Sequence, residues 1–348
     1  MYTIKEISEK LKISANSIRF YEKKKLITPL RGENGYRVFT AKDLSKLQMI
    51  VLYRRMGFSI EAILEIMNSN VENTILEQFS SQYNILNDHI HAMISIRETM
   101  GECIEKMLNT SEIDETMIES MEMTANIIAA SNNWKDSWNF DVWAENYDED
   151  IRIKDNGLNF YDNYDEVLER TSEKIIPGKV VEVGIGTGNL ARRIIENNCD
   201  EIDYIGVEQS INMLKQAKKK CPEAKLRIGN FLKLPLSDNI ADTIVTSYAF
   251  HHCNEDEKAL AIAEMNRVLK KNGRIVIADL MFANDNSRNK FELTCTERQK
   301  EDLEDEYFAN VDKVEEIFSS YGFRCKSEQI DKLIWIVIAD RLQHNKRL

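Results

Sequence analysis

The sequence from Phe79 to Met107, FSSQYNILNDHIHAMISIRETMGECIEKM, sets how the rest of the chain is arranged. Alternating steps of four and three residues along it meet apolar side chains at eight of nine positions, and Arg97 is the exception. This spacing is typical of a coiled-coil seam and predicts a rod about 40 Å long. A narrow apolar stripe needs a second helix to cover it, although a helix packed on its own domain is the alternative. We predict that residues 76–108 form a dimerisation helix through Phe79, Tyr83, Leu86, Ile90, Met93, Met100, Ile104 and Met107.

The composition predicts a soluble protein of two or three domains. Of the 348 residues, 43% are hydrophobic and 30% are charged, which is the balance of globular domains with real cores. No apolar run reaches the length of a membrane span, and the first residues, MYTIKEISEK, lack the core of a signal peptide. The six cysteines show no C-x-x-C spacing, which predicts free thiols rather than disulfides or a metal site. We therefore expect a cytoplasmic protein without membrane contact and without a bound metal.

Charge is divided unevenly along the chain. Residues 1–75 carry 13 Lys and Arg against 8 Asp and Glu, whereas the remaining residues carry 33 against 50. The N-terminal segment is therefore basic and the remainder strongly acidic. Only the N-terminal segment suits a polyanion such as DNA.

Residues 1–75 have the pattern of a winged helix-turn-helix. Apolar spacing predicts a helix over residues 4–11 and a second over 15–24, which Ser14 caps. Two short helices joined by a tight turn place the second one in the major groove of DNA. Asn34-Gly35 predicts the hairpin of a wing, and two further helices are expected over 43–56 and 59–67. The residues of the second helix that we expect to face or flank the groove are Asn16, Ser17, Arg19 and Tyr21.

Three motifs in this order resemble the MerR family of bacterial transcription regulators: SIRFYE at 17–22, NGYRVF at 34–39 and LYRRMGFSI at 52–60. The resemblance covers residues 1 to about 108 and implies a winged helix-turn-helix followed by a long helix that pairs antiparallel in a homodimer. It also implies binding to double-stranded, pseudo-palindromic promoter DNA, whose distortion acts indirectly on RNA polymerase. The family's phosphate and groove contacts correspond to Arg19, Tyr21, Tyr36 and Arg37, which are side chains suited to positioning a protein on the DNA backbone.

Residues 109–139 are expected to form a linker helix and a hinge. Apolar spacing predicts a helix over residues 111–130, which Ser131-Asn132-Asn133 ends, and this break is the expected domain boundary. Trp134, Trp138 and Trp143 then fall within ten residues. Such a cluster suits a packed cap, a lid over a substrate or a seam against the DNA-binding domain, and the pattern leaves these roles open.

The sequence from Lys179 to Leu190, KVVEVGIGTGNL, predicts a buried strand, a glycine turn and the start of a helix. Glycines let a backbone approach a ligand closely, and the G-x-G-x-G spacing differs from the G-x-G-x-x-G of dinucleotide sites. The next strand ends at Glu208, 20 residues past Gly188, where a carboxylate suits the two hydroxyls of a ribose. Strands that alternate with helices predict a doubly wound α/β sheet with its ligand at the strand C-termini. NAD remains an alternative ligand on this pattern.

The order of these elements over residues 140 to about 341 resembles the class I S-adenosylmethionine-dependent methyltransferases. Residues 242–258 are similar to a bacterial group of methyltransferases that also carries a W-A-x-x-Y-D segment, matched here at 143–148. The resemblance implies S-adenosylmethionine as cofactor and a Rossmann-like domain over residues 140–348. Asn230 replaces the usual Asp at the adenine, where its carbonyl can still accept from the adenine amine. The implied cofactor-binding residues are Glu182, Gly184, Gly186, Gly188, Glu208, Gln209, Asn230, Phe231 and Tyr248.

The adjacent histidines His251 and His252 invite a metal or general-base interpretation. Adjacent residues seldom point into one site, however, so a structural or pocket-lining role is the favoured alternative. Methyl transfer needs little beyond alignment of a nucleophile with the sulfonium. The candidate catalytic residues that we place near the methyl acceptor are Tyr147, His251 and Tyr307.

The whole sequence predicts a multidomain chain with an all-α-rich winged helix-turn-helix, a long coiled-coil helix, a linker and an α/β methyltransferase domain. The favoured function is a DNA-binding transcription regulator whose C-terminal domain binds S-adenosylmethionine or S-adenosylhomocysteine and transfers a methyl group to an unknown small molecule. A ligand sensor with an inactive methyltransferase fold is the alternative. A DNA-modifying enzyme is disfavoured, because the chain has neither an Asp/Asn-Pro-Pro-aromatic motif nor a Pro-Cys pair.

Overall fold

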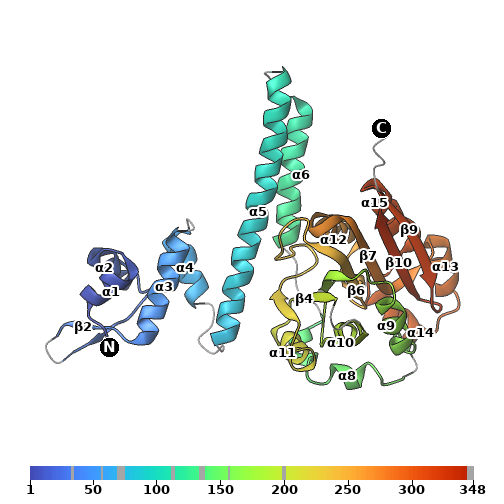
Figure 1. Cartoon of the computed structure of the whole chain (residues 1–348), viewed down its shortest axis with the longest axis horizontal. Coiled ribbons are helices and arrows are strands. Elements are labelled where there is room, and N and C mark those ends of the chain that lie inside the picture. The colour runs from blue at the N-terminus through green and yellow to red at the C-terminus, as the bar shows by residue number, and fades with distance from the viewer. Residues whose placement is uncertain are drawn as a thin grey trace. The chain divides into compact units, whose positions relative to one another are not determined.

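The chain folds into two compact units, Met1–Gln82 and Tyr83–Leu348, which are drawn in Figure 1 from a computed structural model. The structure describes residues 1–32, 35–55, 58–68, 75–110, 114–132, 138–155, 157–197 and 201–342. The division falls inside a long helix, whereas the sequence suggested boundaries near residues 75, 108 and 139. Among the described helices, none is both long and apolar enough to cross a membrane.

The first unit is a winged helix-turn-helix, as the sequence predicts. Its elements are α1 (Ile4–Leu11), α2 (Ala15–Lys23), the antiparallel strands β1 (Leu30–Arg31) and β2 (Arg37–Val38), α3 (Ala41–Arg55) and α4 (Ile60–Asn68). Thr3 caps α1 in a capping box with Glu6, and the Ser14 hydroxyl caps α2. Ile7 and Ile18 meet in the buried core, which fixes the two helices against each other. Asn34 of the expected hairpin turn lies outside the described residues.

Two adjacent aromatic residues of α2 differ in exposure. Tyr21, which we expected to face or flank the groove, is only 8% exposed, whereas Phe20 is 44% exposed. The two rings lie 6.1 Å apart. We therefore assign Tyr21 to the packing of the helix-turn-helix, and Phe20 is the aromatic ring that α2 presents at its surface.

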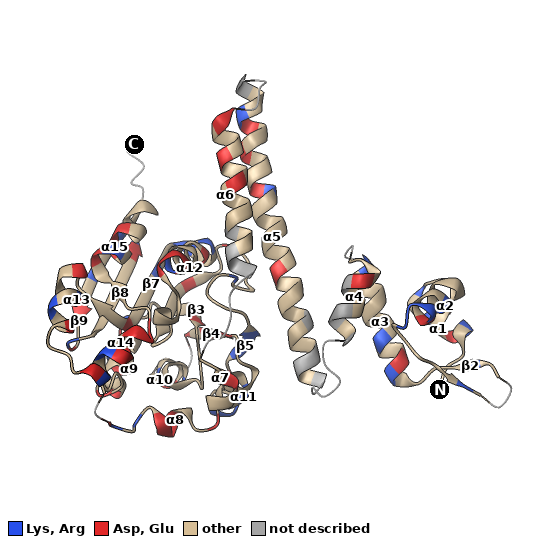
Figure 2. Ribbon diagram, turned by 180° about the vertical axis from the view of Figure 1, so that it is seen from behind, with Lys and Arg blue, Asp and Glu red and all other residues tan. Residues whose placement is uncertain are grey.

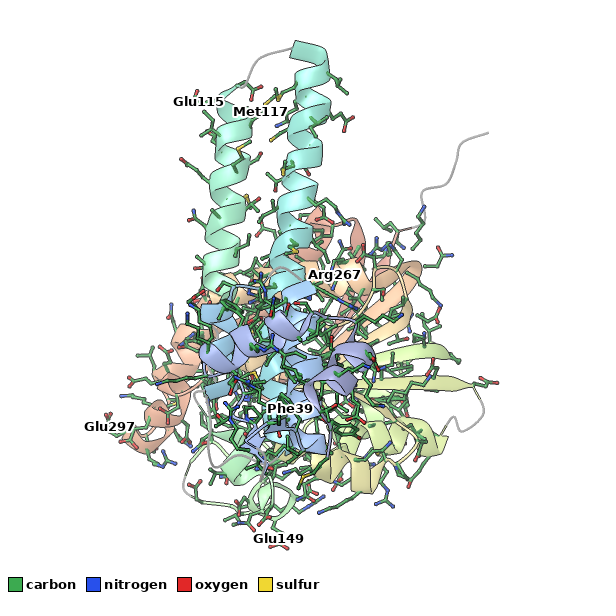
Figure 3. The ribbon with its side chains drawn as sticks, turned by 90° about the vertical axis from the view of Figure 1, so that its left-hand side faces the viewer. Phe39, Glu115, Met117, Glu149, Arg267 and Glu297 are labelled. Atoms are coloured by element: carbon green, nitrogen blue, oxygen red, sulfur yellow. The ribbon has the colours of Figure 1, made fainter. Side chains whose placement is uncertain are left out.

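Helix α5 (Ile75–Thr110) runs beside α6 (Glu115–Asn132) for much of its length (Figures 1 and 2). The hydroxyls of Thr99 and Thr124 lie 2.6 Å apart across the pair. Met117 of α6 is fully buried and lies between the two helices, while Glu115 points away from them (Figure 3). Helix α6 ends at Asn132, within the segment Ser131-Asn132-Asn133 that the sequence predicts as its end.

Helix α5 has two different faces within the second unit. Asn87, His91 and Thr99 bond to other parts of this unit, and Cys103 is buried. Successive residues of a helix turn by about 100°, so His91 and Thr99 lie away from the apolar seam, whereas Asn87 and Cys103 border it. The seam residues are accordingly exposed, at 45% for Ile90, 61% for Met93 and 56% for Ile104. The helix thus packs on its own chain by one face and leaves the seam open, and dimerisation remains a prediction.

The remainder of the second unit is a doubly wound sheet, which confirms the predicted fold class. Strands run in the order β5-β4-β3-β6-β7-β10-β9, and β8 lies beside β7. The pairs from β5 to β7 are parallel, whereas β10 is antiparallel to both of its neighbours. The strands are β3 (Gly178–Val183), β4 (Ile202–Glu208), β5 (Lys225–Ile228), β6 (Ala241–Ser247), β7 (Leu269–Phe282), β8 (Ala309–Asn310), β9 (Phe323–Gln329) and β10 (Ile334–Arg341).

Helices cover both faces of this sheet and bury one apolar cluster on each. One cluster includes residues of α12 and α15, and the other includes residues of α9, α10 and α11. Successive residues of β3 point to opposite clusters, Val181 to the first and Val180 to the second, as a strand requires. The helices are α7 (Phe140–Trp143), α8 (Tyr147–Asp150), α9 (Tyr164–Ser172), α10 (Asn189–Asn197), α11 (Ile211–Lys220), α12 (Glu255–Val268), α13 (Asp285–Glu292), α14 (Glu297–Glu304) and α15 (Val311–Ser320), with a 3-10 turn at Phe250–His252.

The cysteines agree with the expectation of free thiols. Among the described residues, the free thiols are Cys103, Cys221, Cys253, Cys295 and Cys325. Cys199 lies outside the described residues.

Candidate active site

The first unit presents most of its predicted DNA-binding side chains at the surface. Asn16 and Arg19 are exposed and bond to each other, with Arg19 Nη1 2.7 Å from Asn16 Oδ1. Tyr36, next to β2, is 74% exposed. Arg37 of β2 donates to the Glu22 carboxylate of α2 at 2.6 Å, so this ion pair fixes the wing beside the second helix. The DNA-binding role of these residues remains a prediction.

Replacing Arg19 or Arg37 by alanine is expected to weaken binding to all duplex sequences alike. Each change removes one cation from the surface that we expect to face the phosphates. The slope of log affinity against log salt concentration should therefore become less negative by about one. A gel-shift titration at several salt concentrations measures both quantities. Arg324→Ala, which removes an exposed cation of the second unit, is the matched control. Unchanged affinity in both N-terminal variants would remove these arginines from the interface.

A pocket opens at the C-terminal ends of β3, β4 and β6, where the strand order of the sheet reverses. This is the place where open α/β sheets bind their ligands. The pocket is concave and combines apolar and aromatic lining residues with a few polar ones, which is typical of small-molecule sites. Eight of the nine predicted cofactor-binding residues line it; the exception, Gly188, packs against Ala217 of α11 instead. The lining residues that we predicted are Glu182, Gly184, Gly186, Glu208, Gln209, Asn230, Phe231 and Tyr248.

The glycine turn after β3 forms the floor of the pocket. Gly184 and Gly186 both have positive φ, +76° and +54°, a conformation that glycine adopts without strain. A Cβ atom at Gly184 would lie 2.6 Å from Ala249 Cβ, whereas one at Gly186 would meet no protein atom within 4 Å. Gly184 is therefore required by packing within the chain, and Gly186 keeps backbone surface open to a ligand.

Glu208 at the end of β4 places a fixed carboxylate at the pocket wall. One of its oxygens accepts the Gly186 N–H at 3.1 Å, and the other accepts the Ser210 N–H at 2.9 Å. The residue is only 8% exposed, so these two bonds hold the carboxylate in place. Each carboxylate oxygen can accept further hydrogen bonds, which a ribose diol can donate.

Asn230 follows β5 and turns its carbonyl away from the expected direction. Its Oδ1 accepts the backbone N–H groups of Leu232 at 3.0 Å and Lys233 at 3.1 Å. The carbonyl thus caps its own turn, and the amide nitrogen is the group left for a ligand. This corrects the expectation that the carbonyl accepts from an adenine amine; a donor at this position suits a ring nitrogen of the base instead.

Glu182 lies under the glycine turn and is 1% exposed. Burial raises its pKa to about 8, with a further contribution from the nearby charge of Glu208, although the Tyr204 hydroxyl donates to it at 2.7 Å and opposes the shift. Glu182 is therefore largely protonated at neutral pH in the free chain. A carboxyl kept neutral by burial ionises more readily once a cation binds beside it.

Glu182→Gln is expected to raise the unfolding temperature by about 5 °C at pH 8 and by much less at pH 5. In the unfolded chain an ordinary Glu ionises near 4.5, and in the folded chain Glu182 ionises near 8. Between these values the folded state binds more protons, so the stability of the parent chain falls as the pH rises. Glutamine does not ionise, so the variant keeps its stability as the pH rises through this range. Thermal melts across pH 5–8 check the result, with exposed Glu223→Gln as control; a pH-independent difference would contradict it.

Residues 138–150 form a packed cap over the pocket, tied to the sheet at two points. Asp141 accepts the Ser210 hydroxyl at 2.6 Å at the start of α11. Asp148 accepts the Thr187 hydroxyl at 2.6 Å, in the glycine turn, and pairs with Lys220 at 2.6 Å. Trp138 and Trp143 pack within this cap and do not line the pocket, so these two tryptophans take the packing role left open, while Phe140 and Tyr147 beside them line the pocket. Trp134 lies outside the described residues.

Aromatic side chains wall the other end of the pocket. Tyr147 of the cap lines it, as predicted, together with Phe140, Tyr161 and Tyr164, which the sequence analysis did not single out. Tyr248 closes this wall with a positive φ of +49° and a buried hydroxyl that has no hydrogen-bond partner among the described residues. Burial raises the pKa of Tyr147 well above its ordinary value, so this phenol can donate a hydrogen bond but is a poor base.

The two other candidate catalytic residues do not line the pocket. His251 is 2% exposed, and its Nδ1 lies 2.5 Å from the Asp279 carboxylate; Tyr307 is 51% exposed outside the lining. His252 lines the pocket instead, and its ring centroid lies 5.0 Å from that of Phe140. Burial, followed by the nearby His251, lowers the pKa of His252 to about 4, so its imidazole is neutral at pH 7.

Comparison with known proteins places each unit in a family. Residues 181–277 match the family model of a methyltransferase domain, and residues 2–70 match that of the MerR HTH family regulatory proteins. An uncharacterized methyltransferase of Anoxybacillus flavithermus is 35% identical over 209 residues, which are 58% of this chain and 95% of that protein. One of Bacillus cereus is 35% identical over 212 residues, which are 58% of this chain and 96% of that protein. The solved DhpI-SAM-HEP complex shares 14% identity over 57% of this chain and 93% of its own, with a TM-score of 0.45.

These relatives match the C-terminal part of the chain over nearly their entire length. The methyl-donor interpretation of the glycine turn therefore holds, and the NAD alternative does not.

Proposed function

This chain belongs to a family of bacterial methyltransferases and carries a MerR helix-turn-helix domain at its N-terminus, and we propose that it is a transcription regulator whose C-terminal domain binds S-adenosylmethionine and transfers its methyl group to a small molecule. The observation that carries the proposal is the fixed carboxylate of Glu208 beside the open backbone of Gly186. A ribose diol and the methionine part of the cofactor need these two features.

The residues of the pocket fit S-adenosylmethionine in chemistry as well as in position. Glu208 supplies the acceptor for the ribose, and the amide nitrogen of Asn230 supplies a donor for the adenine. Glu182 is a buried carboxyl close to the glycine turn, where the cationic end of the cofactor would favour its ionised form. When bound, the cofactor supplies an electrophilic methyl group on a sulfonium.

The acceptor end of the pocket favours a small molecule that is apolar or aromatic. Phe140 and Tyr147 from the cap line this end of the pocket together with Tyr161 and Tyr248, and such a wall aligns a flat or apolar substrate. Alignment of the nucleophile with the sulfonium supplies much of the rate in such a transfer. The neutral imidazole of His252 lies at the same end and can accept a hydrogen bond from the acceptor.

A turn that follows the adenine site supports communication with the long helix α5. The Asn87 amide of α5 donates to the Lys233 carbonyl at 3.0 Å, and Asp88 pairs with the Lys233 ammonium at 2.8 Å. Lys233 is only 4% exposed at its side chain, and the Asn230 carbonyl holds its N–H. A ligand that engages Asn230 therefore acts on the turn to which α5 is bonded, and α5 continues toward the DNA-binding unit in the sequence.

The same observation favours a second candidate function, a sensor that does not turn over. In that case S-adenosylmethionine or S-adenosylhomocysteine would be read as a signal through Lys233 and Asp88, and the aromatic wall would close over the ligand without an acceptor. Both functions require ligand binding in the pocket. They differ only in whether a methyl group leaves.

Two measurements on the full chain test these proposals. Calorimetry with S-adenosylmethionine and with S-adenosylhomocysteine tests the pocket, and binding of neither would exclude both functions. A promoter-DNA titration with and without the bound ligand then tests communication, for which we expect a several-fold change in DNA affinity. If DNA affinity and promoter output ignore a ligand that binds, the regulatory part of the proposal fails and the enzymatic part stands.

A matched pair of variants isolates the connection through Lys233. Asp88→Asn removes the charge that pairs with the buried ammonium and should abolish the ligand effect on DNA affinity while ligand binding persists. Glu102→Gln changes an exposed acid of the same helix and should leave the effect intact. A ligand effect that survives Asp88→Asn would place the connection elsewhere.

A further inference from the structure

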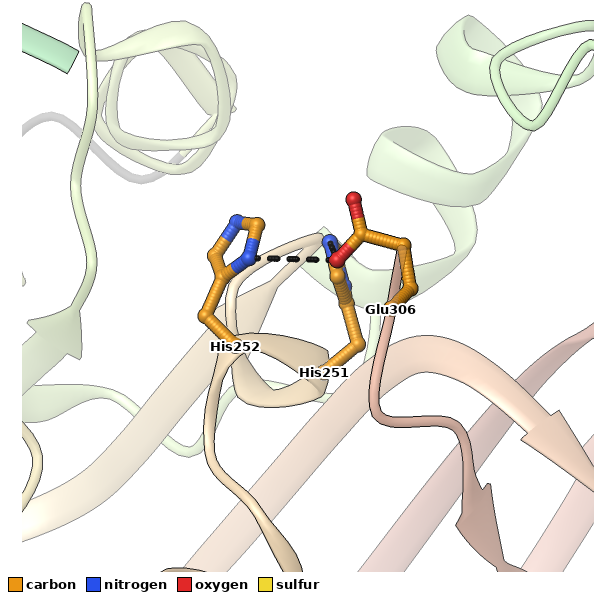
Figure 4. A group of neighbouring side chains, drawn as sticks. All are labelled: His251, His252 and Glu306. Carbon is orange, nitrogen blue, oxygen red and sulfur yellow. Dashed lines mark ion pairs between the residues drawn. The ribbon is translucent and has the colours of Figure 1, made fainter. Parts of the chain in front are cut away.

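Three potential metal ligands converge at the acceptor end of the pocket, from two separate parts of the chain (Figure 4). His251 and His252 follow β6, and Glu306 follows α14. One ligand atom from each residue lies within 4.8 Å of the others. We propose that these three side chains bind a single divalent transition-metal ion, a site that the sequence analysis did not assign.

The separations of the ligand atoms fit a shared ion. Glu306 Oε2 lies 3.4 Å from His252 Nδ1 and 3.8 Å from His251 Nε2. Nitrogen and oxygen ligands bound to one ion at about 2.1 Å stand about 3 to 3.5 Å apart at tetrahedral or octahedral angles. Glu306 Oε2 thus lies at or slightly beyond these separations from both nitrogens, and all three atoms lie within 4.8 Å of one another.

Two of these atoms also lack any other partner. His252 Nδ1 and Glu306 Oε2 are shielded from solvent, and neither has a hydrogen-bond partner among the described residues. Buried polar atoms in native proteins are nearly always satisfied. An ion that both atoms ligate removes this deficit, whereas a direct hydrogen bond between them would require a shorter and better aligned contact.

The third ligand is oriented from behind by a buried carboxylate. His251 Nδ1 faces Asp279 Oδ1 at 2.5 Å, and the other Asp279 oxygen accepts the backbone N–H groups of Ala249 and Phe250. A proton on Nδ1 leaves the lone pair of Nε2 directed toward Glu306. A carboxylate that fixes the tautomer of a ligating histidine is a recurrent feature of protein metal sites.

Two imidazoles and one carboxylate select the type of ion. This set suits Zn²⁺, Fe²⁺, Mn²⁺ or Co²⁺ rather than a hard ion such as Mg²⁺, which prefers oxygen ligands. Three protein ligands leave coordination positions open, and His252 also lines the pocket. A methyl acceptor that carries an oxygen or nitrogen ligand atom can complete the coordination sphere. This role of the ion rests on the proposed methyl transfer, whereas the metal site itself does not.

The test is a titration of the metal-stripped full chain with Co²⁺ alone, followed by visible absorption. We expect one equivalent to bind with d–d bands and without a thiolate charge-transfer band, and Zn²⁺ to displace it. Glu306→Gln and His252→Gln should each weaken this binding at least tenfold, and Glu304→Gln, an exposed acid two residues away, should not.

Two results would overturn the proposal: no saturable Co²⁺ binding by the parent chain, or unchanged binding in both folded variants. The first would mean that His252 and Glu306 are neighbouring side chains that hold no ion. Neither result bears on the cofactor pocket, because calorimetry with S-adenosylmethionine reports on that pocket separately.

Discussion

Glu208→Ala should lower the affinity of the chain for S-adenosylmethionine by about 100-fold. In the proposed complex the carboxylate accepts hydrogen bonds from the two ribose hydroxyls, and hydrogen bonds to a charged group contribute about 1.5–3 kcal/mol each. Loss of two such bonds corresponds to roughly 3 kcal/mol or more, and each 1.4 kcal/mol is about a factor of ten. The change also removes the acceptor of the Gly186 and Ser210 N–H groups, so the glycine turn loses part of its preorganisation.

Calorimetry on the full chain measures this effect directly. Glu223→Ala, which removes an exposed acid shortly after α11, is the control and should bind as the parent chain does. A thermal melt verifies that the Glu208 variant remains folded. A folded Glu208→Ala chain that loses less than about threefold in affinity would show that the ribose lies elsewhere.

Ile90→Asp should convert the chain into monomers and reduce its affinity for a palindromic operator by at least about 100-fold. Ile90 is 45% exposed on the seam of α5, three residues after Asn87, which bonds to the Lys233 carbonyl. A charge placed there meets the apolar seam of a second copy, and burying an unpaired charge is strongly unfavourable. A dimer binds the two half-sites of the operator through two linked DNA-binding units, and this linkage raises its affinity. A monomer contacts one half-site and loses the contribution of the second unit.

Light scattering and a DNA titration, performed on the same preparation, check this result. The control is Leu293→Asp, which makes the same exchange at a residue that is 87% exposed in the methyltransferase domain. The control should remain dimeric and bind the operator normally. A dimeric Ile90→Asp chain would exclude the α5 seam as the dimer interface.

Local sequence patterns predicted the elements of both units and most of the cofactor pocket. The spacing of Gly184 and Gly186, and of Glu208 after them, fixes a strand, a turn and a second strand, and parallel strands bring their C-terminal ends together. Ser14 and Ile18 define a capped helix and its buried side in the same way. These signals lie within a few residues of one another, or on adjacent strands, so the sequence carries them without knowledge of the whole fold.

Other features depended on contacts between distant segments. Nothing in the local pattern pairs Lys233 with Asp88, which are 145 residues apart. Glu306 was not singled out at all, because its significance arises only where it meets His252. The sequence also could not distinguish which of two adjacent histidines faces the pocket, since a 3-10 turn, set by the Asp279 carboxylate, decides the direction of each ring.

The segment from Phe79 to Met107 shows both kinds of information in one helix. Its apolar seam was determined by the sequence alone, because a period of three and four residues places side chains on one side of any helix. The tertiary structure decided what the polar residues beside the seam do: Asn87, Asp88 and His91 are bonded to the turn that follows Asn230. Polar residues on a helix carry no signal that distinguishes solvent from a buried partner, since their hydrogen bonds can be satisfied by either, and only the fold supplies that partner.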